Sequence, residues 1–431
     1  MDFQNYYKNS FPSEDVFNLF NRHDSNTANL NEKKKKQKGA ILPSNREWGI
    51  ETTDGVFMRY KSCETTDDLK KLVSQPNVGK VNTGAVYNET VSLRWKRSSL
   101  SAIYPIRREF IIDIDLTDYA SSGISISKDD VAGNDTHWPL VGIGMIICKT
   151  ILEESFGFNQ FLVVYSGRRG AHLWILDERA SKLDNNARSA IISFMTPPDK
   201  VGEHGRKNFK TLLGYPTFGS GMNPRKQSDI GVNSIFQRLV YKFWMSYAIQ
   251  PLGKNHGLGL LDTRFQREKF LLMSDVKLSV LHIREILAKP DGVSCFQLIE
   301  ELIHLQPRPL RDWTILRMCE SICTLVWPRP DTSVSTHMNH TLKSPYSVHP
   351  GTGRVSMPVF EKNLINFDPS KCPLASDDMP ASFYENVNLL KDLLAAFASP
   401  QEPAPPAPEP EPAAPAPQMS EKAKGKRKMQ Y

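Results

Sequence analysis

Apolar and acidic positions alternate along residues 109–119, which read EFIIDIDLTDY. In a half-buried strand, successive side chains point to opposite faces. The even-numbered apolar residues would therefore share one face, whereas Asp113 and Asp115 share the other. Because a strand rises about 3.3 Å per residue, the Cα atoms of the two aspartates would lie roughly 6.6 Å apart. Carboxylates this close repel each other unless a cation neutralises them, so the pattern indicates a divalent-metal site.

Two further segments have the patterns of a buried helix and of a hairpin. Residues 140–155 carry apolar side chains around more than half of a helix, and Gly157 is a typical C-terminal stop. Residues 161–165 and 172–177 are short and rich in strand-forming residues, and SGRRGA separates them. This arrangement predicts two strands joined by a tight turn, and we expect the chemistry to lie at that turn.

Apolar residues recur with helical spacing farther along the chain, so the region from about 180 to 326 is expected to be mostly helical. The segments with this spacing are 235–249, 295–305 and 312–326. We therefore predict an α/β catalytic domain that a helical subdomain interrupts. The predicted boundaries are 1–190 and 327–370 for the discontinuous catalytic domain, 191–326 for the helical subdomain, 371–398 for a C-terminal extension and 399–431 for a disordered tail.

The tail differs from the rest of the chain in composition. Residues 400–417 consist almost wholly of Pro, Ala and Glu, which cannot bury enough surface to form a core, so we expect an extended segment. The basic cluster at 422–428 fits a nuclear import signal, although short basic clusters also arise without that role. We expect the protein in the nucleus.

Overall composition narrows the class of protein. The chain has 431 residues, of which 40% are hydrophobic, and this is enough for a full core. Its formal net charge of +7 favours an anionic partner such as nucleic acid or nucleotide. Six cysteines without a CxxC pair are expected to be free thiols in a reducing compartment. The pattern at the start of the chain predicts no signal peptide, and no membrane-spanning segment is expected.

The segment Ser166-Gly167-Arg168-Arg169-Gly170 combines two guanidinium groups with flexible backbone, and His172 follows it. Arginine forks bind phosphate oxygens bidentately, and glycines let backbone amides approach the same oxygens. An exposed turn whose arginines pair with surface acids has the same pattern. The acidic pair favours the phosphate interpretation, because nucleotide-binding enzymes need carboxylates for metals and positive charge for phosphates. The chain has no P-loop and no dinucleotide-binding glycine motif.

Four segments together resemble the small, catalytic subunit of the archaeal and eukaryotic DNA primase. Weaker similarities lie near Arg46, Arg59 and Tyr87, and the resemblance runs in order from about residue 3 to residue 370. It implies an α/β fold of the α+β, mixed-sheet primase type. The four segments are EFIIDIDLTDY, VYSGRRGAHLWILDE, WPRPDTSVST and HTLKSPYSVHPGTGRVSMPV.

The resemblance also implies a set of site residues. Asp113, Asp115 and Asp331 would hold two divalent metals, Mg²⁺ or Mn²⁺, and Glu47 would support the site. The reaction would be attack of a 3′-hydroxyl on the α-phosphate of a ribonucleoside triphosphate, giving a short RNA primer on a single-stranded DNA template. The residues implied to bind the nucleotide are Arg59, Ser166, Arg168, Arg169, His172, Lys343 and His349.

By the same resemblance, the protein would pair with a primase large subunit and, through it, with the DNA polymerase alpha complex. The chain departs from the family pattern in two places. Residues 119–139 contain no cysteine and only His137, so we expect no structural zinc there. Asn82 stands where relatives often have an acid, which bears on nucleotide discrimination.

Other functions fit parts of the sequence. Taken singly, Asp331, Lys343 and His349 also suit turn or surface positions. DIDLT matches the DxDxT motif of haloacid-dehalogenase-type phosphatases, in which Asp113 would be a nucleophile and Asp115 an acid/base. That interpretation lacks a strand before the downstream acidic pair at 377–378. A primase-polymerase of the same superfamily that acts in extension or repair, and a nucleic-acid-binding protein without activity, complete the alternatives.

Overall fold

The structure is a computed structural model of the chain. It describes residues 3–22, 41–95, 103–122, 134–195, parts of 264–307, and 327–398. Much of the predicted helical subdomain, the predicted tail and most of the segment examined for zinc ligands therefore lie outside the described residues.

The first sheet joins residues from both ends of the described chain. Its strand order is β2-β1-β3-β4, and β8 pairs with β3. Asn82 of β3 lies opposite Lys343 of β8, so a residue from the C-terminal part of the chain enters the N-terminal sheet. The strands are β1 (Arg46–Thr52), β2 (Phe57–Lys61), β3 (Val78–Tyr87), β4 (Pro105–Arg107) and β8 (Leu342–Lys343).

The second sheet carries the acidic strand and the predicted hairpin. Its order is β5-β7-β6, with β5 (Phe110–Asp115), β6 (Phe161–Tyr165) and β7 (Gly170–Ile175). The hairpin of β6 and β7 confirms the prediction of two strands joined by the SGRRG turn. On its other edge β7 pairs with β5, which places His172 opposite Asp113.

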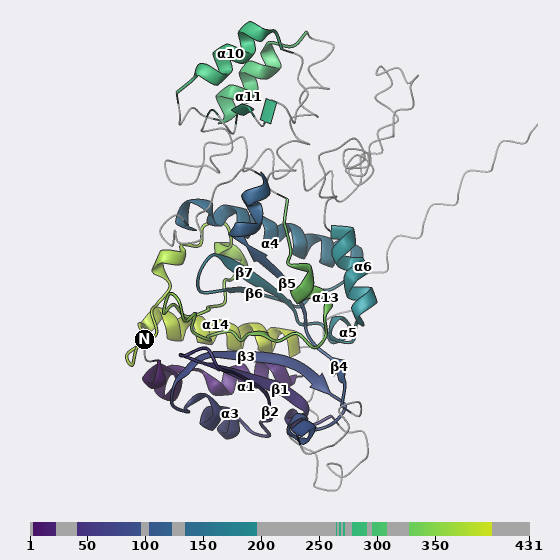
Figure 1. Cartoon of the computed structure of the whole chain (residues 1–431), viewed down its shortest axis with the longest axis vertical. Helices are drawn as coiled ribbons and strands as arrows, with labels where there is room; N and C mark the ends of the chain where they lie inside the picture. The colour runs from purple at the N-terminus through teal and green to yellow at the C-terminus, as the bar shows by residue number, and fades with distance from the viewer. Residues whose placement is uncertain are drawn as a thin grey trace, which may run out of the picture.

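Long helices cover both sheets. The buried helix expected at 140–155 is confirmed as α4 (Asn134–Phe156), and Gly157 follows it with φ of +66°. In Figure 1 the second sheet lies above the first. Helix α4 covers the second sheet, α14 runs between the two sheets, and α1 and α3 lie below the first sheet. The other helices are η1 (Tyr6–Ser10), α1 (Ser13–Asn21), η3 (Pro43–Asn45), α3 (Thr66–Val73), η4 (Val91–Trp95), η6 (Leu116–Ser122), α5 (Glu178–Ser181), α6 (Asn185–Met195), α10 (Val280–Ala288), α11 (Cys295–His304), α13 (Thr332–Thr336), η10 (Glu361–Asn363), η11 (Pro369–Lys371) and α14 (Ala381–Ala398).

The segment predicted as a C-terminal extension packs against the N-terminal residues. Phe383 of α14 is fully buried, and its ring lies edge-on to Tyr6, with 6.2 Å between the ring centroids. The Tyr6 hydroxyl donates a hydrogen bond of 2.7 Å to the Tyr346 carbonyl oxygen. The two ends of the described chain therefore share one core with the segment that carries Lys343.

The chain leaves the described body after α6 and returns at Trp327. The Trp327 indole donates a hydrogen bond of 2.7 Å to the Met195 carbonyl oxygen, so the points of exit and return adjoin. The structure describes two helices between these points, α10 and α11, and α11 matches the helical spacing predicted at 295–305. None of the described helices is long and apolar enough to cross a membrane.

The pairing of the strands differs from the mixed sheet that the family resemblance implies. Every strand pair among the described residues is antiparallel. The short connections explain two of these pairs, since β1 and β2, like β6 and β7, are joined by about four residues, and a parallel pair needs a crossover of a dozen or more. The described catalytic body is thus an α+β arrangement of antiparallel sheets and covering helices.

Close packing of α4 gives a test of the fold. A Cβ atom at Gly142 would overlap the Leu364 carbonyl group, to which the Trp138 indole already donates a hydrogen bond of 2.6 Å. We expect Gly142→Ala to lower the free energy of unfolding by about 2 kcal/mol, because the helix must move away from this backbone. Thermal unfolding measures the effect. Gly351→Ala is the control, because a Cβ atom there meets only ordinary contacts, and an equal loss in both variants would contradict the packing argument.

Candidate active site

The acidic strand β5 holds Asp113 and Asp115 side by side. Their side chains are 23% and 37% exposed. Asp115 Oδ1 accepts hydrogen bonds of 2.8 Å from both the backbone amide and the hydroxyl of Thr117, so the turn into η6 orients this carboxylate. The DIDLT sequence therefore provides both the carboxylates and the group that orients one of them.

The third carboxylate reaches β5 through a backbone contact. Pro330 forms an isolated β-bridge with Ile114, and the Asp331 amide donates a hydrogen bond of 2.9 Å to the Asp113 carbonyl oxygen. Asp331 also caps the N-terminus of α13, since its Oδ1 accepts from the Ser333 amide at 2.8 Å and from the Ser333 hydroxyl at 2.7 Å. Among the described residues its Oδ2 accepts no hydrogen bond, which leaves that oxygen available to a ligand.

The carboxylates interact electrostatically. Burial, and then the charges of Asp115, Asp331 and Asp118, raise the pKa of Asp113 to about 7. Burial and Asp115 also raise the pKa of Asp118. Asp118 is a fourth acid of this cluster that the sequence analysis did not single out, although it lies three residues beyond Asp115 in the same motif.

The donor set fits hard divalent cations. Carboxylate oxygens are the ligands that Mg²⁺ and Mn²⁺ prefer, and the raised pKa of Asp113 indicates a place where added positive charge would be stabilising. In the described part of the chain, no three His, Cys, Asp or Glu side chains already surround one cation-sized position. Asp113, Asp115 and Asp331 are thus the residues that could hold such ions.

A buried arginine donates hydrogen bonds to the short helix α13 and to the residue after it. Arg108 is 1% exposed, and its Nη1 donates to the carbonyl oxygens of Val334 and His337 at 2.8 and 3.0 Å. Its own carbonyl accepts from Arg188 Nη2 at 2.5 Å. Arg108 therefore ties the C-terminal end of α13 to the residue that precedes β5, and the N-terminal end of the same helix carries Asp331.

The SGRRG turn lies directly against the acidic strand. Gly167 has φ of +89°, and a Cβ atom there would come within 2.7 Å of the His349 Cβ. A Cβ atom at Gly170 would overlap the Ile114 carbonyl group. Both glycines are therefore needed for the close approach of this loop. Arg169 Nη2 lies 3.5 Å from Asp115 Oδ2, so the loop directs a guanidinium toward the carboxylates of β5.

Lys343 and His349 join the same loop from the C-terminal segment. The Lys343 ammonium donates to the Ser166 carbonyl oxygen, and Thr352 donates to the Gly167 carbonyl oxygen at 2.7 Å. Burial and the charge of Lys80 lower the pKa of Lys343 to about 7, while burial and Lys343 lower the pKa of His349 to about 3. Cationic groups that disfavour one another's charge are the expected surroundings of an absent anion such as a phosphate.

His172 lies against the acidic strand. Its Nε2 lies 3.7 Å from Asp113 Oδ1, and burial followed by the charge of Lys343 lowers its pKa to about 3. The imidazole is therefore neutral at physiological pH and can orient a carboxylate or a ligand oxygen without adding charge.

Arg59 is held by an ion pair with Glu47 and by a hydrogen bond to the backbone. Its Nε donates to Glu47 Oε1 at 2.8 Å, and its Nη2 donates to Glu47 Oε2 at 3.0 Å and to the Asn339 carbonyl oxygen at 2.8 Å. Glu47 is fully buried and also accepts from the Tyr87 hydroxyl at 3.1 Å. In the described conformation Glu47 thus supports the site by fixing Arg59, and Arg59 fixes the segment that precedes β8.

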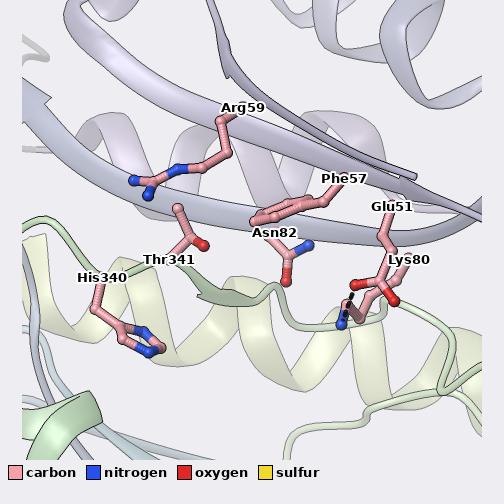
Figure 2. A pocket seen from close by; sticks show the side chains of 7 residues that line it. All are labelled: Glu51, Phe57, Arg59, Lys80, Asn82, His340 and Thr341. Carbon is pink, nitrogen blue, oxygen red and sulfur yellow. Dashed lines mark ion pairs between the residues drawn. The ribbon is translucent and has the colours of Figure 1, made fainter. Parts of the chain in front are cut away.

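Arg59 forms one wall of a pocket of about 300 Å³ between the first sheet and the segment before β8. Figure 2 shows Phe57 on the sheet side between Arg59 and Glu51, with His340 and Thr341 opposite. The sequence analysis assigned no role to most of these residues, although strand alternation places Lys80 and Asn82 on one face. The lining residues are Glu51, Phe57, Arg59, Lys80, Asn82, His340 and Thr341.

Comparison with known proteins identifies the family. The sequence profile of the DNA primase small subunit matches residues 112–360, which span β5, the SGRRG turn, Asp331 and the segment of Lys343 and His349. The chain belongs to the DNA primase small subunit family. It is accordingly an enzyme of the nucleotidyltransferase class, a DNA-directed RNA polymerase.

Individual relatives match over most of the chain. The DNA primase small subunit of Schizosaccharomyces pombe is 27% identical over 377 residues, which cover 86% of this chain and 75% of the relative. That of Caenorhabditis elegans is 27% identical over 382 residues, covering 85% and 84%. An archaeal small subunit, from Thermococcus kodakarensis, is 28% identical over 226 residues, covering 51% and 54%. The similarity thus extends from eukaryotic to archaeal members of the family.

The electrostatics of the primase carboxylates predict a pH-dependent stability. In the folded chain the pKa of Asp113 is raised to about 7, so its ionisation destabilises the fold above its ordinary pKa near 4. We expect Asp113→Asn to raise the melting temperature by about 2–4 °C in EDTA. The gain should grow between about pH 4 and pH 7 and then level off. Thermal unfolding across this range measures it, and a gain that is the same at pH 4 and pH 8 would contradict the mechanism.

The hydrogen bonds from Arg108 to α13 lead to a prediction about the metal dependence of activity. Arg108→Met keeps the buried volume but frees the C-terminal end of the helix that carries Asp331. We expect about a tenfold rise in the Mn²⁺ or Mg²⁺ concentration for half-maximal primase activity, with a smaller change in the KM for nucleotide. Arg179→Met is the control, because Arg179 also donates to a carbonyl oxygen, that of Gly157 at 2.6 Å, outside the site. Unchanged metal dependence in Arg108→Met would contradict the role of Arg108 in positioning Asp331.

Proposed function

We propose that the chain synthesises short RNA primers on single-stranded DNA by two-metal nucleotidyl transfer. The observation that carries this proposal is the meeting of Asp113, Asp115 and Asp331 beside a loop that gathers positive charge. The carboxylates come from residues as far apart in the chain as Asp115 and Asp331. A polymerase that acts on nucleoside triphosphates needs the carboxylates and the positive charge in contact.

The three carboxylates would hold two Mg²⁺ or Mn²⁺ ions, which supply activation of the primer 3′-hydroxyl and stabilisation of the leaving pyrophosphate when bound. Asp331 uses Oδ1 as a helix cap, and its Oδ2 would be the oxygen that binds metal. Asp115 is oriented by Thr117. His172, neutral and 3.7 Å from Asp113, would keep that carboxylate oriented while its charge is compensated.

The triphosphate would lie along the SGRRG turn. Arg168, Arg169 and Lys343 provide positive charge, and Ser166 and His349 provide polar groups at the same place. Lys343 donates to the Ser166 carbonyl oxygen, so its ammonium already lies at the loop. Burial and the charge of Lys80 lower the pKa of Lys343, and a bound phosphate would stabilise its charged form, which would favour a polyanion at the loop.

The nucleoside half of the substrate would enter the pocket of Figure 2. Lys343 at the phosphate end lies opposite Asn82, which lines the pocket. A volume of about 300 Å³ suits a base and a sugar. Arg59 lines the same pocket and would contribute to binding the nucleotide there.

The phosphatase alternative is not favoured. The downstream acidic pair that it would need does not join the carboxylates of β5, since Asp377 accepts a hydrogen bond of 2.9 Å from Asn5 at the N-terminal end of the chain. A primase-polymerase that acts mainly in extension remains a second candidate, because the same carboxylates and loop would serve it. Formation of a primer without any starting strand distinguishes a primase from such an enzyme.

The partners and the cellular location are also part of the proposal. Membership of a family of small subunits supports a heterodimer with a primase large subunit, and through it an association with the DNA polymerase alpha complex in a nuclear primosome. The basic cluster near the end of the chain supports the nuclear location.

The decisive experiment is extension of an RNA primer on a single-stranded DNA template with ribonucleotides and Mn²⁺ or Mg²⁺. Asp331→Asn retains an oxygen that can cap α13 but removes the charge that would hold metal. We expect this variant to lose activity by about a hundredfold or more with little change in melting temperature. Asp368→Asn is the matched control, because Asp368 caps η11 through Ser370 in the same way but lies outside the carboxylate cluster.

Equal rates for the wild type and Asp331→Asn would contradict the metal-binding role. Extension by the wild type, without primer formation from nucleotides alone after addition of the large subunit, would favour the primase-polymerase. Metal-dependent release of phosphate from small phosphoesters, with no extension, would favour the phosphatase.

A further inference from the structure

We propose that Phe57 is the platform on which the base of the incoming nucleotide stacks, within the pocket of Figure 2. This inference rests on the proposed function, because it takes the triphosphate to lie at the SGRRG turn. It adds the element that holds the other end of the substrate. Stacking of a base on Phe57 involves no hydrogen bond, so this contact would be of the same kind for every base.

The first sheet holds the ring of Phe57 in a hollow beside Gly49. Gly49 lies opposite Asn82, and a Cβ atom at Gly49 would come within 3.0 Å of Phe57 Cε2. The missing side chain of Gly49 thus leaves the hollow in which the ring is seated. Phe57 lies opposite Glu51, and Glu51 lies opposite Lys80. The ring is 43% exposed, although the glycine beneath it anchors its edge.

The two ends of the proposed nucleotide site differ, with Lys343 at the phosphate end and Phe57 at the aromatic end. Lys343 pairs across the strands with Asn82, and Asn82 in turn pairs with Gly49, under the ring of Phe57. The Asn82 side chain is 5% exposed, and its Nδ2 has no hydrogen-bond partner among the described residues. A buried donor of this kind points to a ligand that completes its hydrogen bonding. A nucleotide with phosphates at Lys343 therefore has its base near Phe57.

Charge favours a neutral occupant at the aromatic end. Both cations of the pocket have carboxylate partners: Arg59 binds Glu47 at 2.8 Å, and Lys80 binds Glu51. The Arg59 guanidinium also lies over the Tyr60 ring, 4.8 Å from its centroid. Lys343, whose ammonium donates to the Ser166 carbonyl oxygen of the SGRRG turn, marks the phosphate end instead. A flat, uncharged heteroaromatic ring is the part of a nucleotide that fits between these paired groups.

The chemistry of Phe57 suits a template-directed enzyme. Such an enzyme must accept all four bases, and base–aromatic stacking is tolerant of sequence because every base has a π face. Stacking grows with the area of overlap, so purines should depend on Phe57 more than pyrimidines do. Base identity would then be decided by the template, and Phe57 would contribute affinity alone.

The test measures single-nucleotide addition opposite each template base, with Phe57→Ala, Phe57→Leu and Phe57→Trp. Phe57→Leu keeps an apolar side chain over Gly49 but removes the π face. We expect about a tenfold rise in the KM for ATP and GTP in the Ala and Leu variants, a smaller rise for UTP and CTP, and a nearly unchanged kcat. Phe57→Trp should retain the wild-type KM. Tyr104→Ala is the matched control, because Tyr104 is 57% exposed and does not line the pocket.

A binding measurement separates the ring from the phosphate loop and needs no catalysis. Calorimetric titration compares ATP with inorganic tripolyphosphate for the wild type and the three variants. Weaker ATP binding with unchanged tripolyphosphate binding in Phe57→Ala and Phe57→Leu is the expected result. Equal ATP affinity in all variants, or equal loss for both ligands, would overturn the role of Phe57. An inactive wild type that still shows the expected binding differences would count against the proposed function and leave the stacking platform supported.

Discussion

The site depends on one backbone hydrogen bond, from the Asp331 amide to the Asp113 carbonyl oxygen. Together with the bridge between Pro330 and Ile114, it fastens the PRPD segment to the edge of β5. The edge is available because, among the strands that the structure describes, β5 is outermost in its sheet and pairs only with β7. A third carboxylate thereby joins two that already repel each other. Backbone bonding offsets a repulsion that side chains alone would not overcome, and Arg108 holds the far end of the helix that follows.

This contact also places a cluster of negatively charged carboxylates close to the positively charged Lys343. Burial and the neighbouring carboxylates raise the pKa of Asp113, and burial and the charge of Lys80 lower that of Lys343. Each group partly relieves the other, since Lys343 lowers the pKa of Asp113 and Asp113 raises that of Lys343. The fold is thus strained electrostatically at this place, and the metal ions and triphosphate that we propose as ligands would relieve that strain. Strain of this kind is common where a site must bind strongly charged ligands.

The segment from β8 to Val359 sets the distance between the two halves of the proposed substrate site. At one end Lys343 is part of the first sheet, through its pairing with Asn82. At the other end the Val359 amide donates to the Val163 carbonyl oxygen at 2.8 Å, on the second sheet. His349, between these points, packs against Gly167 of the phosphate loop. A nucleotide that spans both sheets would therefore meet groups whose spacing the backbone holds, and this preorganisation lowers the cost of ordering them on binding.

The sequence by itself determined the local elements of this primase. Period-two alternation placed Asp113 and Asp115 on one face of a strand, and the glycines of SGRRG indicated the hairpin, because these patterns reflect the geometry of a few consecutive residues. Only the family resemblance brought Asp331 into the site, since no local pattern records which distant segment pairs with a strand edge. The tertiary structure decided that Arg59 binds Glu47, that Arg108 supports α13 and that Phe57 lies over Gly49. These contacts depend on how strands and helices far apart in the chain pack together, which periodicity and spacing do not encode.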